Sequence, residues 1–196
     1  MREYTAAELL AARELRAAMI QKLVEHYHTP LLVMRVNYPG LKKMNELTLK
    51  IIQDMSAWLC RILGEKICFT SLQRGAEGPI FLAAVAEDAL ILKKAAINWE
   101  EQHILGRCLD LDVYDNSGKG ISRLELGFPG RKCYLCEDFA RYCVRARRHS
   151  EREVIQYIED KFREYCNSED REKIWSKNGV IRCERGETEL YRRPGN

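Results

Sequence analysis

The sequence predicts one α+β domain, in which a mixed or mostly antiparallel five-stranded sheet carries packed helices, including an N-terminal helix and C-terminal helices. Two observations lead to this prediction. Helical and strand patterns follow one another in the order helix, strand, helix, strand, strand, helix, strand, strand, and then helices. The chain of 196 residues, 46% hydrophobic and 31% charged, is also long enough to bury the core of one domain. We expect that domain at residues 1–178 and a polar C-terminal extension at residues 179–196.

The N-terminal third is expected to form two helices separated by a strand. Thr5-Ala-Ala-Glu8 is a capping box, so a helix should begin there and run to about His26. Leu31–Val36 reads as a strand, and the turn at Asn37–Gly40 contains a proline that fixes φ and a glycine that permits the left-handed conformation. A second helix is expected at about 44–63, because a glycine follows it at the usual C-terminal position.

The middle of the chain is expected to supply the other four strands. Residues 66–72 and 79–86 read as a hairpin, and residues 87–101 read as a helix with one apolar face. An alternating strand follows at 109–113, and a turn that contains a glycine leads to a returning strand at 121–126.

Asp110 and Asp112 lie in the alternating strand and should share a face, because successive strand side chains point to opposite faces. Two neighbouring carboxylates repel each other unless a divalent cation such as Mg²⁺ lies between them, and such a cation can anchor the phosphates of a substrate. The alternative is an ordinary strand whose polar face meets water.

The returning strand favours the metal site. If the leucines of both strands meet on the core face, three carboxylates and one arginine gather on the other face. The register that does this pairs Leu111 with Leu124, Asp112 with Arg123, and Asp110 with Glu125.

The C-terminal part is expected to be helical at 137–148 and, after the capping box Ser150-Glu-Arg-Glu153, to about Asn167. The first of these helices carries four arginines with no acid between them, which would attract phosphates or acidic proteins. They are Arg141, Arg145, Arg147 and Arg148.

Cys133, Cys136, Cys143 and His149 form a set that resembles a zinc site. A continuous helix at 137–148 would separate Cys136 from Cys143 by about 10 Å along its axis. Two thiolates on one tetrahedral zinc must lie within roughly 4 Å of each other. Buried thiols that pack as small apolar groups are therefore the preferred interpretation, and a four-ligand zinc site is the alternative.

The composition limits the partners and the location. The net charge of +3 is too small to indicate nucleic-acid binding, and no apolar stretch is long enough to cross a membrane. The N-terminus has neither the apolar region nor the cleavage site of a signal peptide, so we expect a cytoplasmic protein.

The combination of these motifs resembles one known family. The residues on which this resemblance rests are His103-x-Leu-Gly-Arg-x-x-Asp-Leu-Asp-Val113, Ser122-Arg123, Arg131-x-Cys133-x-x-Cys136, Cys143, Arg145 and His149. Upstream, the similarity includes Ala12-Arg-Glu14, Asn37-x-Pro-Gly40 with Lys43, Ala76-Glu-Gly78 and Leu92-Lys93, and it covers about residues 9–165. The family is the citrate lyase holo-acyl-carrier-protein synthases, also called apo-citrate lyase phosphoribosyl-dephospho-CoA transferases.

The resemblance implies an enzyme that transfers phosphoribosyl-dephospho-CoA from triphosphoribosyl-dephospho-CoA to a serine of the acyl carrier subunit of citrate lyase and releases diphosphate. Mg²⁺ at Asp110 and Asp112 would bridge the triphosphate, and Glu125 would be a third ligand or the base. Four cationic residues would bind the substrate, namely Arg107, Arg123, Arg131 and Lys93. Three would dock the carrier, namely Arg141, Arg145 and Arg148.

Two other functions stay open. One is a nucleotidyltransferase of the same general mechanism that acts on a related carrier protein. The other is a non-catalytic zinc module that binds RNA or protein through its arginines, although the basic stretch contains few of the aromatic residues that stacking on bases requires.

Overall fold

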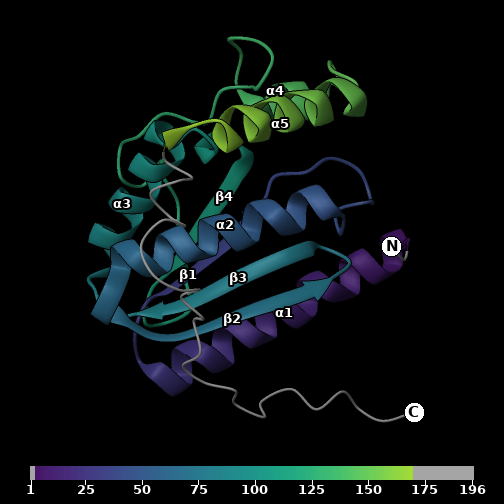
Figure 1. Ribbon diagram of the computed structural model, residues 1–196. Helices are drawn as coiled ribbons and strands as arrows, with labels where there is room; N and C mark the ends of the chain where they lie inside the picture. The colour runs from purple at the N-terminus through teal and green to yellow at the C-terminus, as the bar shows by residue number, and fades with distance from the viewer. Residues whose placement is uncertain (1–2, 170–196) are drawn as a thin grey trace.

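A five-stranded antiparallel sheet forms the centre of the computed structural model, which describes residues 3–169 (Figure 1). The strand order is β2-β3-β1-β4-β5, and every neighbouring pair is antiparallel. The strands are β1 (Leu31–Val36), β2 (Ile67–Gly75), β3 (Gly78–Val85), β4 (Leu109–Tyr114) and β5 (Gly120–Ile121). This architecture confirms the predicted fold class.

Helix α1 (Ala6–Tyr27) covers one face of the sheet. It begins with the predicted capping box, in which the Thr5 hydroxyl accepts a hydrogen bond from the Glu8 amide and the Glu8 carboxylate accepts one from the Thr5 amide. The apolar residues near its C-terminal end pack on β1 and β3. They are Ile20, Leu23 and Val24 on the helix, and Leu31, Val33, Ile80, Leu82 and Ala84 on the strands.

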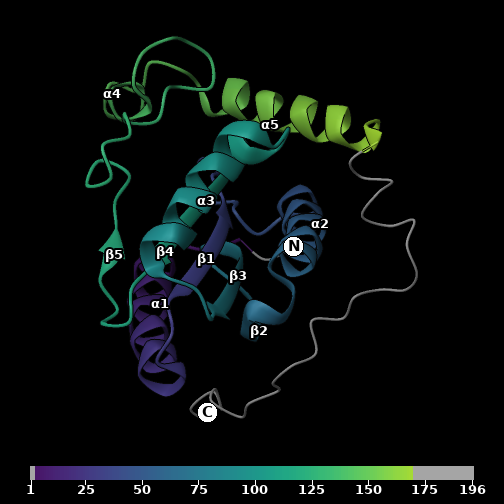
Figure 2. The same ribbon diagram turned by 90° about the vertical axis from the view of Figure 1, so that its left-hand side faces the viewer.

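The opposite face is covered by α2 (Glu46–Leu63), α3 (Ala89–Gln102) and α5 (Glu151–Cys166), so the sheet lies between two helical layers (Figure 2). The larger core lies on this side and includes Leu32 and Met34 of β1 and Leu109, Leu111 and Val113 of β4, all at most 1% exposed. The alternation in β4 therefore turns its leucines and valine toward this core and its aspartates toward the face of α1.

The predicted returning strand at 121–126 is wrong. Strand β5 has two residues, and it pairs Ile121 with Val113 and Gly120 with Tyr114, one residue away from the expected register. Leu124, expected in the core, is 60% exposed. The physical reason is a local capping box: the Ser122 hydroxyl accepts from the Glu125 amide and the Glu125 carboxylate accepts from the Ser122 amide, so the chain curls into turns.

The predicted helix at 137–148 is also too long at both ends. Helix α4 is limited to Ala140–Arg145, and the chain before it makes a tight loop closed by a bridge between Lys132 and Phe139. Cys136 lies in this loop and not on a helix, so the expected separation from Cys143 does not occur. Their sulfur atoms are 3.4 Å apart.

One expectation concerns residues beyond the described part of the chain, and another concerns helices that could cross a membrane. The predicted C-terminal extension at 179–196 lies outside the described residues, and so does the proposed boundary at 178. None of the helices between residues 3 and 169 combines the length and the apolar character that crossing a bilayer requires.

The short β5 leaves part of the β4 edge without a neighbouring strand, and α3 side chains replace it. The Leu111 amide donates to the Glu100 carboxylate at 2.8 Å, and the Leu111 carbonyl accepts from Lys93 Nζ at 3.0 Å. Both side chains are nearly fully buried. The backbone amide and carbonyl of Leu111 are therefore satisfied by two buried charges, which fix α3 against β4.

We expect Lys93→Met to lower the free energy of unfolding by about 1–3 kcal/mol, because the Leu111 carbonyl would then be buried without a donor. Urea denaturation followed by circular dichroism measures the change. The matched control is Lys94→Met on the exposed side of the same helix, which should have almost no effect. Equal losses in the two variants would contradict the role of Lys93.

Candidate active site

Asp110 and Asp112 project together from β4 onto the face of the sheet that α1 partly covers. They share this face as the alternation predicted, and their side chains remain 36% and 35% exposed. The pairing of β4 with β1 sets Arg35 directly across from Asp110. The pair is therefore open to a ligand and has a cationic neighbour on the adjacent strand.

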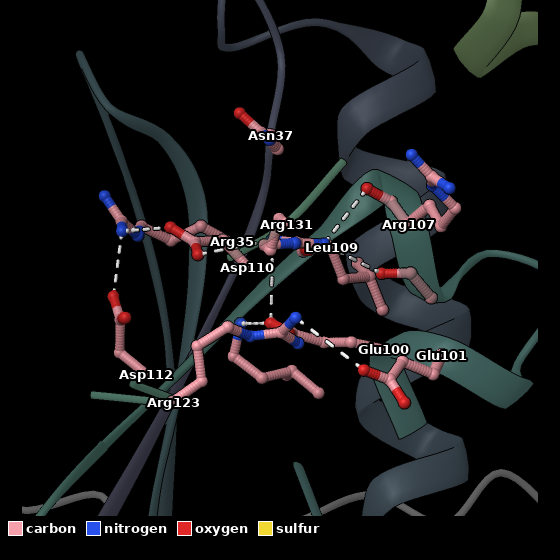
Figure 3. A network of polar contacts seen from close by, with 12 residues as sticks. Arg35, Asn37, Glu100, Glu101, Arg107, Leu109, Asp110, Asp112, Arg123 and Arg131 are labelled. Atoms are coloured by element: carbon pink, nitrogen blue, oxygen red, sulfur yellow. Dashed lines mark hydrogen bonds and ion pairs between the residues drawn. The ribbon is translucent and has the colours of Figure 1, made fainter. Parts of the chain in front are cut away.

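Arg35 joins the two carboxylates. Its Nη2 atom lies 2.5 Å from Asp110 Oδ2 and 2.9 Å from Asp112 Oδ2, so both aspartates point at one cationic nitrogen (Figure 3). Sequence reasoning did not identify Arg35. The available signal was its position as the single charged residue of an otherwise apolar strand.

A buried glutamate holds Arg35 from its other side. Glu77, at the tip of the β2–β3 hairpin, is 4% exposed and lies 3.6 Å from Arg35 Nη1. It also accepts a hydrogen bond from Arg16 Nε of α1 at 2.9 Å. Gly78 lets this tip approach the chain before α2, because its φ is +88° and a Cβ there would lie 2.8 Å from the Lys43 carbonyl.

The charges of the site perturb one another. Burial raises the pKa of Asp112, the Asp110 carboxylate raises it further, and Arg35 opposes both effects. For Arg35, burial lowers the pKa, but Asp110, Asp112 and Glu77 together leave it above its ordinary value. The guanidinium therefore stays charged, while the second aspartate is held in a state that favours a proton or a cation.

A second charged cluster adjoins the first around Glu100 of α3, which is 5% exposed. Arg123 Nη2 lies 2.9 Å from Glu100 Oε2, and Arg131 Nη1 lies 3.6 Å from Glu100 Oε1. The same Arg131 nitrogen lies 3.6 Å from Asp110 Oδ1, so it connects the two clusters (Figure 3). Burial raises the pKa of Glu100, and Arg131 opposes this effect.

Arg131 is held by backbone as well as by carboxylates. Its Nη2 atom donates to the carbonyl of Leu109 at 2.7 Å, and also lies within reach of the carbonyls of Gly106 and Arg107. The η2 turn (Gly106–Cys108) that supplies the last two carbonyls leads directly into β4. Arg131 is therefore fixed beside Asp110. Such a fixed orientation suits a residue that contacts a ligand of this site.

The other predicted residues have different neighbours. Arg123 does not lie across from Asp112 but bonds Glu100, and Glu125 is exposed and bonds the Ser122 amide, since the expected register is wrong. Arg107 donates to the carbonyls of Lys132 and Cys133. Together with the buried Lys93, it holds backbone in place.

The arginines assigned to docking lie on and after α4. Arg141 Cζ stacks 4.7 Å from the centre of the Tyr142 ring, and Arg148 pairs with Asp138 at 2.7 Å. Arg145 is exposed. Apolar side chains are exposed among them, including Phe139, Tyr142 and Val144. This surface is both basic and apolar.

The aspartate pair supplies the kind of oxygen donors that a divalent cation would need, with Arg35 lying between the carboxylates in this structure. Both Oδ2 atoms already point at one positively charged nitrogen, the carboxylates are partly open to solvent, and oxygen donors are those that Mg²⁺ prefers. The residues that would hold it are Asp110 and Asp112.

Comparison with known proteins places this chain among transferases. A family model described as apo-citrate lyase phosphoribosyl-dephospho-CoA transferase matches residues 4–165, and the chain belongs to this family.

Relatives carry the same description. A probable apo-citrate lyase phosphoribosyl-dephospho-CoA transferase of Vibrio cholerae serotype O1 (strain M66-2) is 34% identical over 81% of this chain and 91% of its own length. The transferases of Shigella flexneri serotype 5b and Citrobacter koseri are 32% and 33% identical over 78% of this chain and 85% of their own lengths. The predicted family and the predicted enzyme class are confirmed.

The raised pKa of Asp112 gives a dependence of stability on pH. Between the ordinary value of about 3.9 and the raised value, the folded chain binds more protons than the unfolded chain, so this carboxyl makes the free energy of unfolding fall as pH rises. Asp112→Asn should remove this fall and leave the protein at least as stable at neutral pH. Urea denaturation from acidic to neutral pH measures it.

Asp115→Asn is the control with the opposite sign. The Ser117 hydroxyl lowers the pKa of Asp115, so its contribution to stability is present at neutral pH and is lost as pH falls. A marked loss of stability at neutral pH for Asp112→Asn would contradict the inference that the charged form of Asp112 is unfavourable in the folded chain.

Proposed function

We propose that this protein transfers the phosphoribosyl-dephospho-CoA group from triphosphoribosyl-dephospho-CoA to a serine of the apo acyl carrier subunit of citrate lyase, in the cytoplasm, and releases diphosphate. The observation that carries the proposal is the carboxylate pair, about one-third exposed, that converges on one cationic nitrogen, with Arg131 beside it. Family membership supplies the donor group and the acceptor.

In the proposed reaction, the serine oxygen bonds to the phosphorus nearest the ribosyl group of the donor, and the serine hydroxyl proton is released to water. The bond from this phosphorus to the rest of the triphosphate breaks, and diphosphate leaves with the bonding electrons. Negative charge grows on the leaving oxygens, so the chain must present fixed cations to them. Asp110 and Asp112 would hold Mg²⁺, which when bound neutralises phosphate charge.

Arg131 is the chain's own phosphate ligand in this proposal. Its guanidinium is oriented by three backbone carbonyls and lies near Asp110, so little side-chain entropy is lost when it contacts a phosphate. Arg35 balances the charge of the aspartates, and Glu77 and Arg16 hold it in place. Arg107, Arg123 and Lys93 are proposed to act through the backbone and Glu100, as positioning residues.

The surface at α4 is proposed to bind the carrier. Arg141 and Arg145 supply positive charge, and the exposed side chains of Phe139, Tyr142 and Val144 supply apolar contact. An acidic carrier protein is complementary to this combination. A related carrier of another lyase or decarboxylase stays the alternative substrate, and a transfer assay with exchanged carriers distinguishes the two.

We expect Asp110→Asn and Asp112→Asn each to lower the rate of transfer at least about a hundredfold, because several kcal/mol of phosphate charge stabilisation would be lost. The assay incubates enzyme, apo-carrier, Mg²⁺ and triphosphoribosyl-dephospho-CoA and measures the mass of the carrier. Glu125→Gln tests the structural correction, since its exposed side chain lies among turn residues and the rate should stay within about twofold. An active Asp112→Asn enzyme would refute the site.

We expect Arg145→Glu to raise the KM for the carrier about tenfold and to leave the KM for the nucleotide donor within about twofold, because it changes charge only at the docking surface. Steady-state kinetics with each substrate varied in turn measures both constants. Lys50→Glu, an exposed charge reversal on α2, is the control and should change neither. Equal effects of the two reversals would place the docking surface elsewhere.

A further inference from the structure

The loop before α4 brings together four residues that are distant from the aspartate pair in the sequence. One ligand atom from each of Cys133, Cys136, Cys143 and His149 lies within 4.8 Å of every other. The sulfur atoms of Cys136 and Cys143 are 3.4 Å apart, and all three cysteines are free thiols. With Zn–S of about 2.3 Å, the sulfur atoms of a tetrahedral zinc site are separated by about 3.8 Å, so the set needs only small shifts to close on one ion.

Burial and unused hydrogen-bonding capacity also indicate a ligand. Cys133 and Cys143 are buried, at 8% and 4% exposure. Nε2 of His149 is shielded from solvent and makes no hydrogen bond within residues 3–169. A buried polar nitrogen without a partner is costly, and a metal ion would give this imidazole one.

The segment around the cluster buries few apolar side chains of its own. Between residues 129 and 149, Cys133 and Cys143 are the only buried hydrophobic residues, while Leu135, Phe139, Tyr142 and Val144 are all exposed to 38% or more. Helix α4 has six residues, too few to be stable by itself. Its backbone is held by polar contacts, such as the Cys133 amide donating to the Asp138 carbonyl at 2.7 Å.

A guanidinium lies beside one of the sulfur atoms that would carry the charge of such a site. Three thiolates and a neutral imidazole leave one excess negative charge on a zinc complex. Arg148 Nη1 lies 4.0 Å from Cys136 Sγ, and Asp138 holds this guanidinium at 2.7 Å. A cation oriented toward a ligating sulfur is typical of the outer shell of a zinc–thiolate site.

We propose that Cys133, Cys136, Cys143 and His149 bind one structural Zn²⁺. Four protein ligands leave no open position for substrate, so the ion holds the fold of residues 129–149 and does not take part in transfer. Arg131 lies two residues before Cys133, and the carbonyls of Lys132 and Cys133 accept from Arg107 next to β4. The zinc site therefore positions Arg131 beside the aspartate pair.

The test measures metal directly in the full chain, purified under reducing conditions from zinc-supplemented cells. Elemental analysis should find about one zinc per chain, and cobalt substitution should give the thiolate charge-transfer and visible bands of tetrahedral cobalt. Cys136→Ser and His149→Gln should each lower the zinc content at least about fivefold. Cys68→Ser, at an exposed free cysteine of β2, should keep it.

Three results would overturn the proposal, and the first two need no variant. A wild-type chain without zinc that also gives no thiolate–cobalt absorption has no such site. A peptide map that recovers Cys136 disulfide-linked to Cys143 would assign the pair to redox chemistry. Full zinc content in both ligand variants would place the metal elsewhere. These measurements require no transferase substrate, so they stand apart from the proposed activity.

Discussion

The antiparallel pairing of β1 with β4 is the constraint on which the candidate site depends. It sets Arg35 directly opposite Asp110, so that one guanidinium nitrogen lies between the two carboxylates. The same pairing buries Leu109 and Leu111 on the other face, which holds the register of the strand firmly. A shift by one residue would bury both aspartates and expose the leucines. Core packing on one face therefore fixes the electrostatics of the other.

Two buried glutamates extend this arrangement away from the sheet. Glu77 connects the β2–β3 hairpin to α1 and to Arg35, and Glu100 connects α3 to β4 and to Arg131. Burial of either carboxylate without a partner would be strongly unfavourable, and each one is balanced by arginines and hydrogen bonds. The charges at the surface of the site are thus supported by charges beneath it, which keeps the cationic side chains oriented without a ligand.

Local sequence signals predicted most of the elements, because capping boxes, glycine stops and hydrophobic periodicity act within a few residues of one another. The errors arose where such a signal was overlooked or overridden. Ser122 and Glu125 form a capping box inside a segment interpreted as a strand. At Cys136, the bridge between Lys132 and Phe139 replaces the first helical turn with a loop. That loop brings together the four zinc-type ligands that a continuous helix would have kept apart.

By itself the sequence determined the fold class, the family and the shared face of Asp110 and Asp112, because strand alternation and motif order are properties of neighbouring residues. Only the tertiary structure decided which charges meet that face. Arg35 is 75 residues from Asp110 along the chain, and Glu77 and Arg16 are 61 residues apart. Strand order and hairpin contacts bring these groups together, and they depend on how helices and strands pack rather than on local propensity.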